Sequence, residues 1–435
     1  MVNIFQNPNT TAILAGIAVI FSYFLAKRVS NQYLLAGLIF LGLVAFFGCI
    51  YLESRSVLLA VCSVIILDKL LQPADKVSRK SKIKLLILLF LLGVTSTFYK
   101  HNSTLGRAFI YKVDFLIAKE NWLTGINAPY NIVFNHTQAN YFKENPNAPL
   151  HEKLLAGNNY YVLNEWVNVL LQFGVFAFLL SLVLTIYIVR LSVQEISVNS
   201  EKSWAAGIIL FFLVISLFLY PFRYIPYHFV FSCCVIYNLR NVTILGIKTT
   251  TIFWKIGILL LTVHSGISIF RHQKNELDNH EVSELIRIGH INSALTKCLS
   301  MHTNDSTNFI VTQRLADLYE QKNKLDSALF YISSAHNHVC NDNLHNFWGR
   351  CLQGMGRKED AIVQYELAVN IKPHKFKNRV DLLSLLLQSG RIQQAEACAE
   401  EIINIPEKIP SAKSAFYKQY AKKTIDSLNT PRKTF

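Results

Sequence analysis

Four side chains that could take part in a reaction lie near the ends of apolar runs: Arg55, Arg107, Arg223 and Glu165. A guanidinium has a permanent charge and a fork of donors, which suits a phosphate-like anion. A glutamate can serve as a general base. Simpler interpretations stay open: the arginines would contact lipid headgroups, and Glu165 would only favour its helix N-terminus, by about 0.3–1 kcal/mol. Asn164, just before it, is a good N-cap residue.

Histidines and cysteines show no metal-binding spacing. His136 and His151 lie in one polar loop and are interpreted as surface residues. The eight cysteines include no CxxC pair; four lie in apolar runs, and a disulfide among the other four stays open. The sequence therefore predicts no metal site and no cofactor.

The elements that must position these residues are membrane helices. The chain has 435 residues, 51% of them hydrophobic, and a mean hydropathy of +0.28, which is too apolar for an ordinary soluble protein of this size. Apolar stretches of membrane-spanning length gather in residues 1–270. Eight spans are predicted, at about 11–26, 33–52, 57–72, 84–99, 165–189, 204–220, 226–239 and 251–270. The fold class is therefore all-α, with a polytopic transmembrane bundle.

Basic residues predict the orientation of this bundle. They follow the first span and fill every second loop after it, at Lys27, Arg28, Lys76, Arg79, Lys80, Lys82, Lys84, Arg190, Lys202, Arg240 and Lys248. Loops of this kind stay in the cytoplasm. The loop 100–163 and the C-terminal part are then external. The formal net charge of +15 is assigned to topology and anionic headgroups, and no nucleic-acid partner is expected because no such motif occurs.

Residues 271–435 contain a repeat. The segments "GHINSA", "NKLDSA", "GRKEDA" and "GRIQQA" end in Ala294, Ala328, Ala361 and Ala395, spaced 34, 33 and 34 residues apart. This period is the signature of tetratricopeptide repeats. The best copy carries Gly349, Gly356, Ala361, Tyr365, Ala368 and Pro373. The array is either a partner-binding surface or a stabilising spacer.

The external loop also carries a helical pattern. Ile110, Val113 and Ile117, flanked by Phe109, fall on one stripe of a helix, with lysines toward the other side. This predicts an amphipathic helix lying at the membrane surface.

Several short motifs occur in the order found in a known family. They are "FQNPNTTAILAG" at 5–16, "ESRS" at 53–56, "GR…Y…WLTGIN" at 106–127, "TQANYF" at 137–142 and "LNEWVNVLLQFGVFAF" at 163–178. With them the chain resembles the O-antigen ligase and polymerase-like membrane proteins of bacterial surface-glycan assembly, in a branch with C-terminal tetratricopeptide repeats.

The resemblance implies a multi-pass protein of the bacterial inner membrane, with a transmembrane domain at 1–270 and a periplasmic repeat domain at 271–435. It implies transfer or polymerisation of a glycan from undecaprenyl pyrophosphate to a lipid, protein or glycan acceptor. The expected catalytic residues are Arg107, Glu165 and Arg55, and the expected substrate-binding residues are Arg223, Tyr141, Asn164 and Gln138. The repeats would hold a protein partner.

Two departures support an alternative function. Leu163 stands where ligases of this family have a histidine, and the "FQNPN" motif begins at residue 5 rather than in mid-chain, as in a short member. The alternative is a non-catalytic membrane scaffold whose repeats recruit partners of envelope glycan assembly.

Overall fold

The computed structural model describes residues 8–73, 76–99, 101–239, 243–244, 247–248, 251–407 and 410–429. The expectations on Phe5–Asn7 and Arg240 lie outside these residues. The all-α class is confirmed, with one small exception: β1 (Thr243–Ile244) and β2 (Ile247–Lys248) form an antiparallel pair. The chain divides into two compact units. One comprises residues 1–104, 123–125 and 162–275, and the other comprises 105–122, 126–161 and 276–435.

The first unit holds a helix at each of the eight predicted spans. They are α1 (Pro8–Ala26), α2 (Gln32–Tyr51), α3 (Arg55–Leu71), α4 (Arg79–Tyr99), α8 (Glu165–Ser197), α9 (Ser203–Ile215), α10 (Ile225–Leu239) and the first part of α11 (Thr251–Arg287). Within the described residues, three of these helices, α1, α2 and α8, are long and apolar enough to cross a membrane. Two more, α9 and α10, are apolar but shorter.

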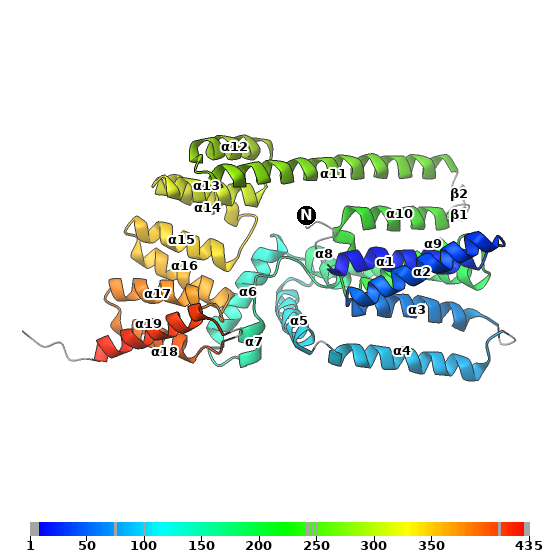
Figure 1. The fold of residues 1–435 in the computed structure, drawn as a ribbon, viewed down its shortest axis with the longest axis horizontal. Helices are drawn as coiled ribbons and strands as arrows, with labels where there is room; N and C mark the ends of the chain where they lie inside the picture. Colours follow the sequence, from blue (N-terminus) through cyan, green and yellow to red (C-terminus); the bar gives the residue numbers. More distant parts are fainter. Residues whose placement is uncertain are drawn as a thin grey trace, which may run out of the picture. The chain divides into compact units, whose positions relative to one another are not determined.

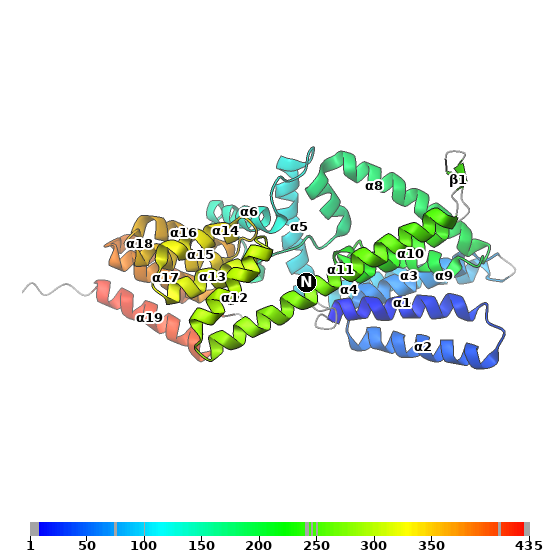
Figure 2. The ribbon, with the colours of Figure 1, turned by 90° about the horizontal axis from the view of Figure 1, so that it is seen from above.

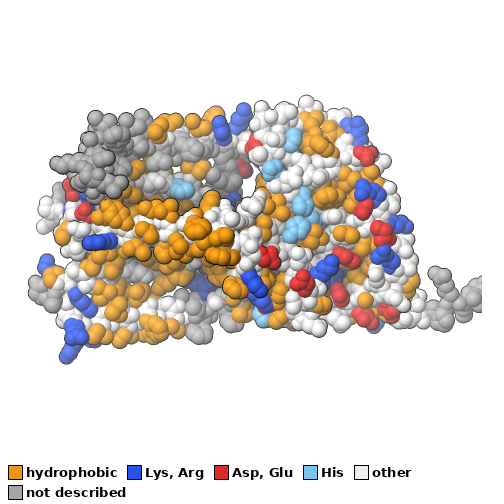
Figure 3. Space-filling model, turned by 180° about the vertical axis from the view of Figure 1, so that it is seen from behind, with side chains coloured by type: hydrophobic (Ala, Val, Ile, Leu, Met, Phe, Trp, Pro, Cys, Tyr) orange, Lys and Arg blue, Asp and Glu red, His pale blue; other side chains and the backbone are white. Residues whose placement is uncertain are grey.

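Helix α9 forms the centre of this unit. It packs against α1, α3, α8 and α10, and every side chain from Ala205 to Phe212 is buried. A helix that is apolar on all sides is stable only when neighbours surround it. The outer helices α2 and α4 expose large apolar side chains, such as Phe40 and Phe90, each 70% exposed. Apolar side chains cover much of this unit in Figure 3, as expected for a surface that contacts lipid.

Helix α8 is bent at Gly174, which corrects the expectation of one regular span at 165–189. The backbone of Gly174 has φ 77° and ψ −177°, so a short first piece of α8 is set at an angle to the rest (Figure 2). The apolar pattern runs through the bend without a break, which is why it did not indicate one.

The second unit contains the repeats as stacked helical hairpins (Figure 1). The helices are α12 (Ile291–Asn304), α13 (Phe309–Gln321), α14 (Leu325–His336), α15 (Asp342–Gly354), α16 (Lys358–Ile371), α17 (Phe376–Gln388), α18 (Ile392–Asn404) and α19 (Ala412–Asn429). The four recurring segments each make the turn inside a hairpin, and the first hairpin pairs the end of α11 with α12. The four repeated alanines are all 0% exposed.

The repeat signature has a local physical cause at each turn. Gly289, Gly356 and Gly390 adopt positive φ values of 81°, 77° and 69°, and Asn323 takes the equivalent place with φ 56°. Glycine and asparagine are the residues that enter this region at lowest cost. Inside a hairpin, a Cβ on Gly349 would lie 2.8 Å from the ring of Tyr365, so only glycine lets α15 and α16 approach this closely.

The external loop belongs to the repeat unit, which differs from the sequence-based division at residue 270. Its helices are α5 (His101–Asn121), α6 (Tyr130–Glu144) and α7 (Leu150–Leu155), and α6 packs on α16. Its residues 105–122 and 126–161 form one compact body with the repeats, whereas its two ends and Leu123–Gly125 belong to the first unit.

Candidate functional site

Asn164 and Glu165 lie at the N-terminal end of α8, which we call the mouth of α8. The Asn164 side chain caps the helix by accepting hydrogen bonds from the backbone N–H groups of Trp166 at 2.8 Å and Val167 at 3.2 Å. Its own amide donates to the carbonyl of Leu217 at 2.9 Å. Asn164 therefore performs the capping role that the sequence left open, and it also ties α8 to the turn after α9.

Glu165 uses its carboxylate to hold the turn that leads into α10. Its Oε1 accepts a hydrogen bond of 3.0 Å from the backbone N–H of Phe222, inside the 3-10 turn η2 (Pro221–Arg223). The charge of Arg223, the next residue, acts on this carboxylate, and the Arg223 side chain is exposed. The structure therefore brings together two of the predicted site residues, an exposed cation and a half-buried carboxylate.

The end of the external loop is anchored beside this mouth. A Cβ on Gly125 would lie 2.5 Å from the carbonyl oxygen of Gln172, and one on Gly174 would lie 2.2 Å from that of Leu123. Two stretches of backbone therefore touch where α8 bends. The glycine of "WLTGIN" is required by this contact, because a side chain would meet backbone that cannot move aside.

Arg55 lies at the start of α3 and lines a pocket in the first unit. Its guanidinium donates to the hydroxyls of Thr104 at 3.3 Å and Ser103 at 3.4 Å. The pocket has a volume of about 360 Å³ and is lined by Ile50, Glu53, Arg55, Leu58, Leu59, Cys62, Leu92 and Thr95. Most of this lining is apolar, while Arg55 and Glu53 supply charge. Such a pocket can hold an aliphatic chain while its charged residues contact a polar head.

Arg107 lies half-buried on α5, in the repeat unit, so the structure does not bring it into one unit with Arg55 and Glu165. The predicted amphipathic helix is confirmed, but its apolar stripe faces protein rather than a membrane surface. Phe109, Val113 and Ile117 are at most 3% exposed, and Phe109 packs against Phe142 of α6 with ring centroids 5.6 Å apart. Phe142 of α6 therefore takes the place at Phe109 that lipid was expected to fill.

Asp114 is a buried acid that the sequence did not single out. It is 2% exposed, and Oδ1 accepts a hydrogen bond of 2.6 Å from the hydroxyl of Tyr130. Burial raises its carboxyl pKa to about 7, although the Tyr130 hydrogen bond acts in the opposite direction. The sequence signal that could have indicated this buried acid was an aspartate directly after Val113, on the buried side of the predicted helix.

Tyr141 belongs to a polar triad that joins the three loop helices. Lys112 donates to the Tyr141 hydroxyl and to the Glu152 carboxylate, each at 2.7 Å, and Tyr141 donates to Glu152 at 2.6 Å. Burial raises the Glu152 pKa, but the bonds from Lys112 and Tyr141 outweigh it and leave that pKa below its ordinary value. The triad ties α7 to α5 and α6.

Gln138 lies where the loop docks on the repeats. Its amide is 1% exposed and donates to the carbonyl of Ile371 at 2.7 Å. One turn earlier on α6, Asn135 donates to the carbonyl of Cys340 at 2.7 Å. Since a buried carbonyl without a partner is costly, these amides hold α6 against the repeats. In this arrangement Gln138 does not face solvent.

Asp342 completes the docking contact. It is 0% exposed and accepts hydrogen bonds from Asn158 of the loop at 2.7 Å and from Asn378 at 3.1 Å, with Lys375 at 2.5 Å. Burial raises the pKa of its carboxyl, but these partners outweigh it and keep the pKa below the ordinary range. Asp342 therefore stays ionised and links the loop to two hairpins.

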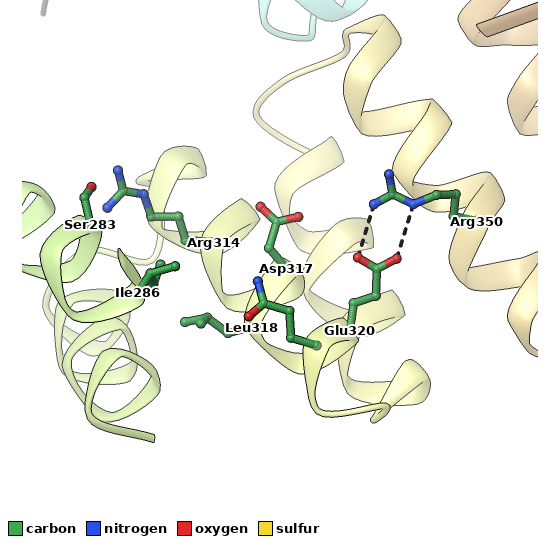
Figure 4. A pocket seen from close by; sticks show the side chains of 8 residues that line it. Ser283, Ile286, Arg314, Asp317, Leu318, Glu320 and Arg350 are labelled. Carbon is green, nitrogen blue, oxygen red and sulfur yellow. Dashed lines mark hydrogen bonds and ion pairs between the residues drawn. The ribbon is translucent and has the colours of Figure 1, made fainter. Parts of the chain in front are cut away.

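The first helices of successive repeats line a charged pocket of about 470 Å³ (Figure 4). It is lined by Ser283, Ile286, Arg314, Asp317, Leu318, Glu320, Gln321 and Arg350. Arg350 forms a two-point contact with Glu320, at 3.3 and 3.1 Å, and Asp317 lies between Arg314 and Glu320. Burial, assisted by the charge of Glu320, raises the Asp317 pKa to about 6. The pocket has the size and polarity to receive a polar segment of a partner.

The eight cysteines all lie in the described part of the chain, and each is a free thiol in this structure.

Comparisons with known proteins identify one domain. A family described as O-antigen ligase matches residues 8–182. No curated protein matches the chain. Among solved structures, MamA is similar to this chain, with 13% sequence identity and a TM-score of 0.29. The similarity covers 34% of this chain and 91% of the MamA chain.

Two further solved structures are similar at the same low level. YrrB, a TPR protein with an unusual peptide-binding site, has 14% sequence identity to this chain and a TM-score of 0.27. The similarity covers 35% of this chain and 84% of the YrrB chain. Yeast Tom70 has 11% sequence identity and a TM-score of 0.24, and the similarity covers 92% of this chain and 88% of the Tom70 chain. The motifs and the family match agree over the same segment, and residues 8–182 are thus a domain of the O-antigen ligase family.

Proposed function

We propose that the protein transfers or polymerises a glycan from an undecaprenyl-pyrophosphate donor on the periplasmic face of a bacterial inner membrane. O-antigen ligase-family membership supports a membrane protein of glycan assembly. The observation that carries the donor class is the pocket at Arg55, where an apolar lining stands beside a half-buried guanidinium. A polyprenyl diphosphate has the matching chemistry: an aliphatic chain attached to an anionic head.

The reaction needs two kinds of group. An acceptor hydroxyl attacks the anomeric carbon, the bond from that carbon to the diphosphate oxygen breaks, and the diphosphate leaves with the electron pair. Arg107 and Arg55 are proposed to stabilise the charge that develops on the diphosphate. Glu165 is proposed to take the hydroxyl proton, and Arg223 and Asn164 to orient the substrate beside it.

Tyr141 and Gln138 receive a different proposed role. Both are engaged in contacts inside the loop and with the repeats, so we assign them to positioning the loop that carries Arg107. The repeats are proposed to bind a protein partner in the pocket at Arg314 and Arg350.

The proposal requires an external loop and external repeats, so a topology experiment is the first check. With eight crossings in the proposed orientation, residue 435 would lie in the periplasm. Alkaline phosphatase fused after Phe435 is then expected to be active, because the enzyme folds only outside the cytoplasm. A fusion after Ser200, in a predicted cytoplasmic loop, serves as the control. Activity at Ser200 together with inactivity at Phe435 would reverse the proposed orientation.

Deletion of the gene tests the function itself. The deletion strain is expected to lose one surface glycan on gels of lipopolysaccharide or glycoprotein, and to accumulate the corresponding polyprenyl-linked glycan in lipid extracts. Expression of the wild-type chain should restore both. If neither lipopolysaccharide nor glycoprotein changes and no lipid-linked glycan accumulates, the protein is not the transferase, and the scaffold function takes its place.

A further inference from the structure

Three histidines from distant parts of the chain meet in the repeat unit. His136 lies on the loop helix α6, His336 at the end of α14, and His345 in the first half of α15. One ring nitrogen from each lies within 4.8 Å of those of the other two. His336 and His345 have ring centroids 5.1 Å apart, and His136 and His336 stack at 5.5 Å.

The spacing is close to that of a metal site. Two imidazole nitrogens bound to one tetrahedral Zn²⁺ lie about 3.3 Å apart, given Zn–N bonds of about 2.0–2.1 Å. The ring nitrogens would have to move closer by at most about 1.5 Å to reach that value, starting from 4.8 Å. Imidazole is a good ligand for zinc, copper and nickel but a poor one for calcium or magnesium.

The surroundings of His345 match those of a metal ligand. Its Nδ1 lies 2.8 Å from Oε1 of Gln364. In the tautomer with hydrogen on Nδ1, the ring donates to this amide oxygen and keeps a lone pair on Nε2. Metal-bound histidines commonly donate their second ring nitrogen in this way. In this structure the thiol of Cys340 contacts Nε2 at 3.2 Å, a contact that a bound metal ion would replace, and Trp348 stacks on the ring.

We propose that His136, His336 and His345 bind a Zn²⁺ ion that staples the external loop to the repeat array. The sequence alone gave no indication of this cluster, because the three histidines are up to 209 positions apart in the sequence. The ion would join α6 to the second and third hairpins, beside the amides of Asn135 and Gln138. It would thereby hold the loop helices on the array independently of those hydrogen bonds.

The test uses the full-length chain in detergent, purified with a tag that contains no histidine and stripped with a chelator. After equilibrium dialysis against Zn²⁺ and elemental analysis, we expect about one zinc ion per chain, with the fourth coordination position open to water. Removing a ligand should lower zinc affinity at least tenfold, since even neighbours of metal ligands have effects of 10–100-fold. His136→Gln is the main variant, because His136 is only half-buried and lies on the loop side.

His280→Gln is the matched control, because His280 is exposed in the same unit, outside the cluster. It should retain zinc, and zinc should raise the melting temperature of wild type and of this control but not that of His136→Gln. Circular dichroism shows whether each variant is folded. The proposal is overturned if wild type binds no more zinc than folded His136→Gln, or if His280→Gln loses zinc equally.

Discussion

Arg107→Ala is expected to reduce glycan transfer by about 100-fold or more, the usual loss when one preorganised donor to a developing charge is removed. Arg107→Lys should be impaired as well, because lysine keeps the charge but loses the two-point fork that fits a diphosphate. The measurement is the amount of surface glycan restored in the deletion strain at equal protein level. Accumulation of the lipid-linked donor provides a second reading.

The matched control is Arg190→Ala, an exposed arginine near the predicted cytoplasmic end of the transmembrane bundle. It should support wild-type transfer. Limited proteolysis of the repeat unit should be the same in the Arg107 variants as in wild type, which separates loss of chemistry from loss of fold. Wild-type glycan with Arg107→Ala would mean that Arg107 only contacts headgroups.

Gly174→Ala is expected to destabilise the first unit strongly. Its φ of 77° and ψ of −177° lie in a region open almost only to glycine, and a Cβ there would lie 2.2 Å from the Leu123 carbonyl oxygen. Backbone strain and overpacking each cost about 1–3 kcal/mol, so the sum is on the order of 2–6 kcal/mol. We expect a lower melting temperature in detergent and faster cleavage of the chain near residues 123–125.

Gly37→Ala is the control for this substitution. Gly37 also lies in an apolar helix of the first unit, but no atom lies within 4 Å of the Cβ position, so the variant should behave as wild type. Equal stability of Gly174→Ala and Gly37→Ala would show that residues 123–125 do not contact α8 at its bend.

Local pattern alone determined much of this protein. Each predicted span corresponds to a helix, and the repeat period located the four hairpin turns, because these features depend on neighbouring residues: glycine or asparagine at positive φ, and alanine where paired helices touch. Asn164 at the start of α8 is another such feature, since an N-cap is satisfied within three residues. Apolar length and repeat period are properties that a single stretch of chain carries by itself.

Only the tertiary structure decided which parts of the protein the external loop contacts. Its apolar stripe at Phe109 suits lipid or protein equally well, and only the presence of α6 decided between them. The buried amide of Gln138 finds its acceptor at Ile371, and His136 meets His345, over sequence separations of more than 200 residues. No local pattern records such partners, because a buried polar group specifies only that a partner is needed. Which distant segment supplies that partner is settled when the loop packs on the repeats.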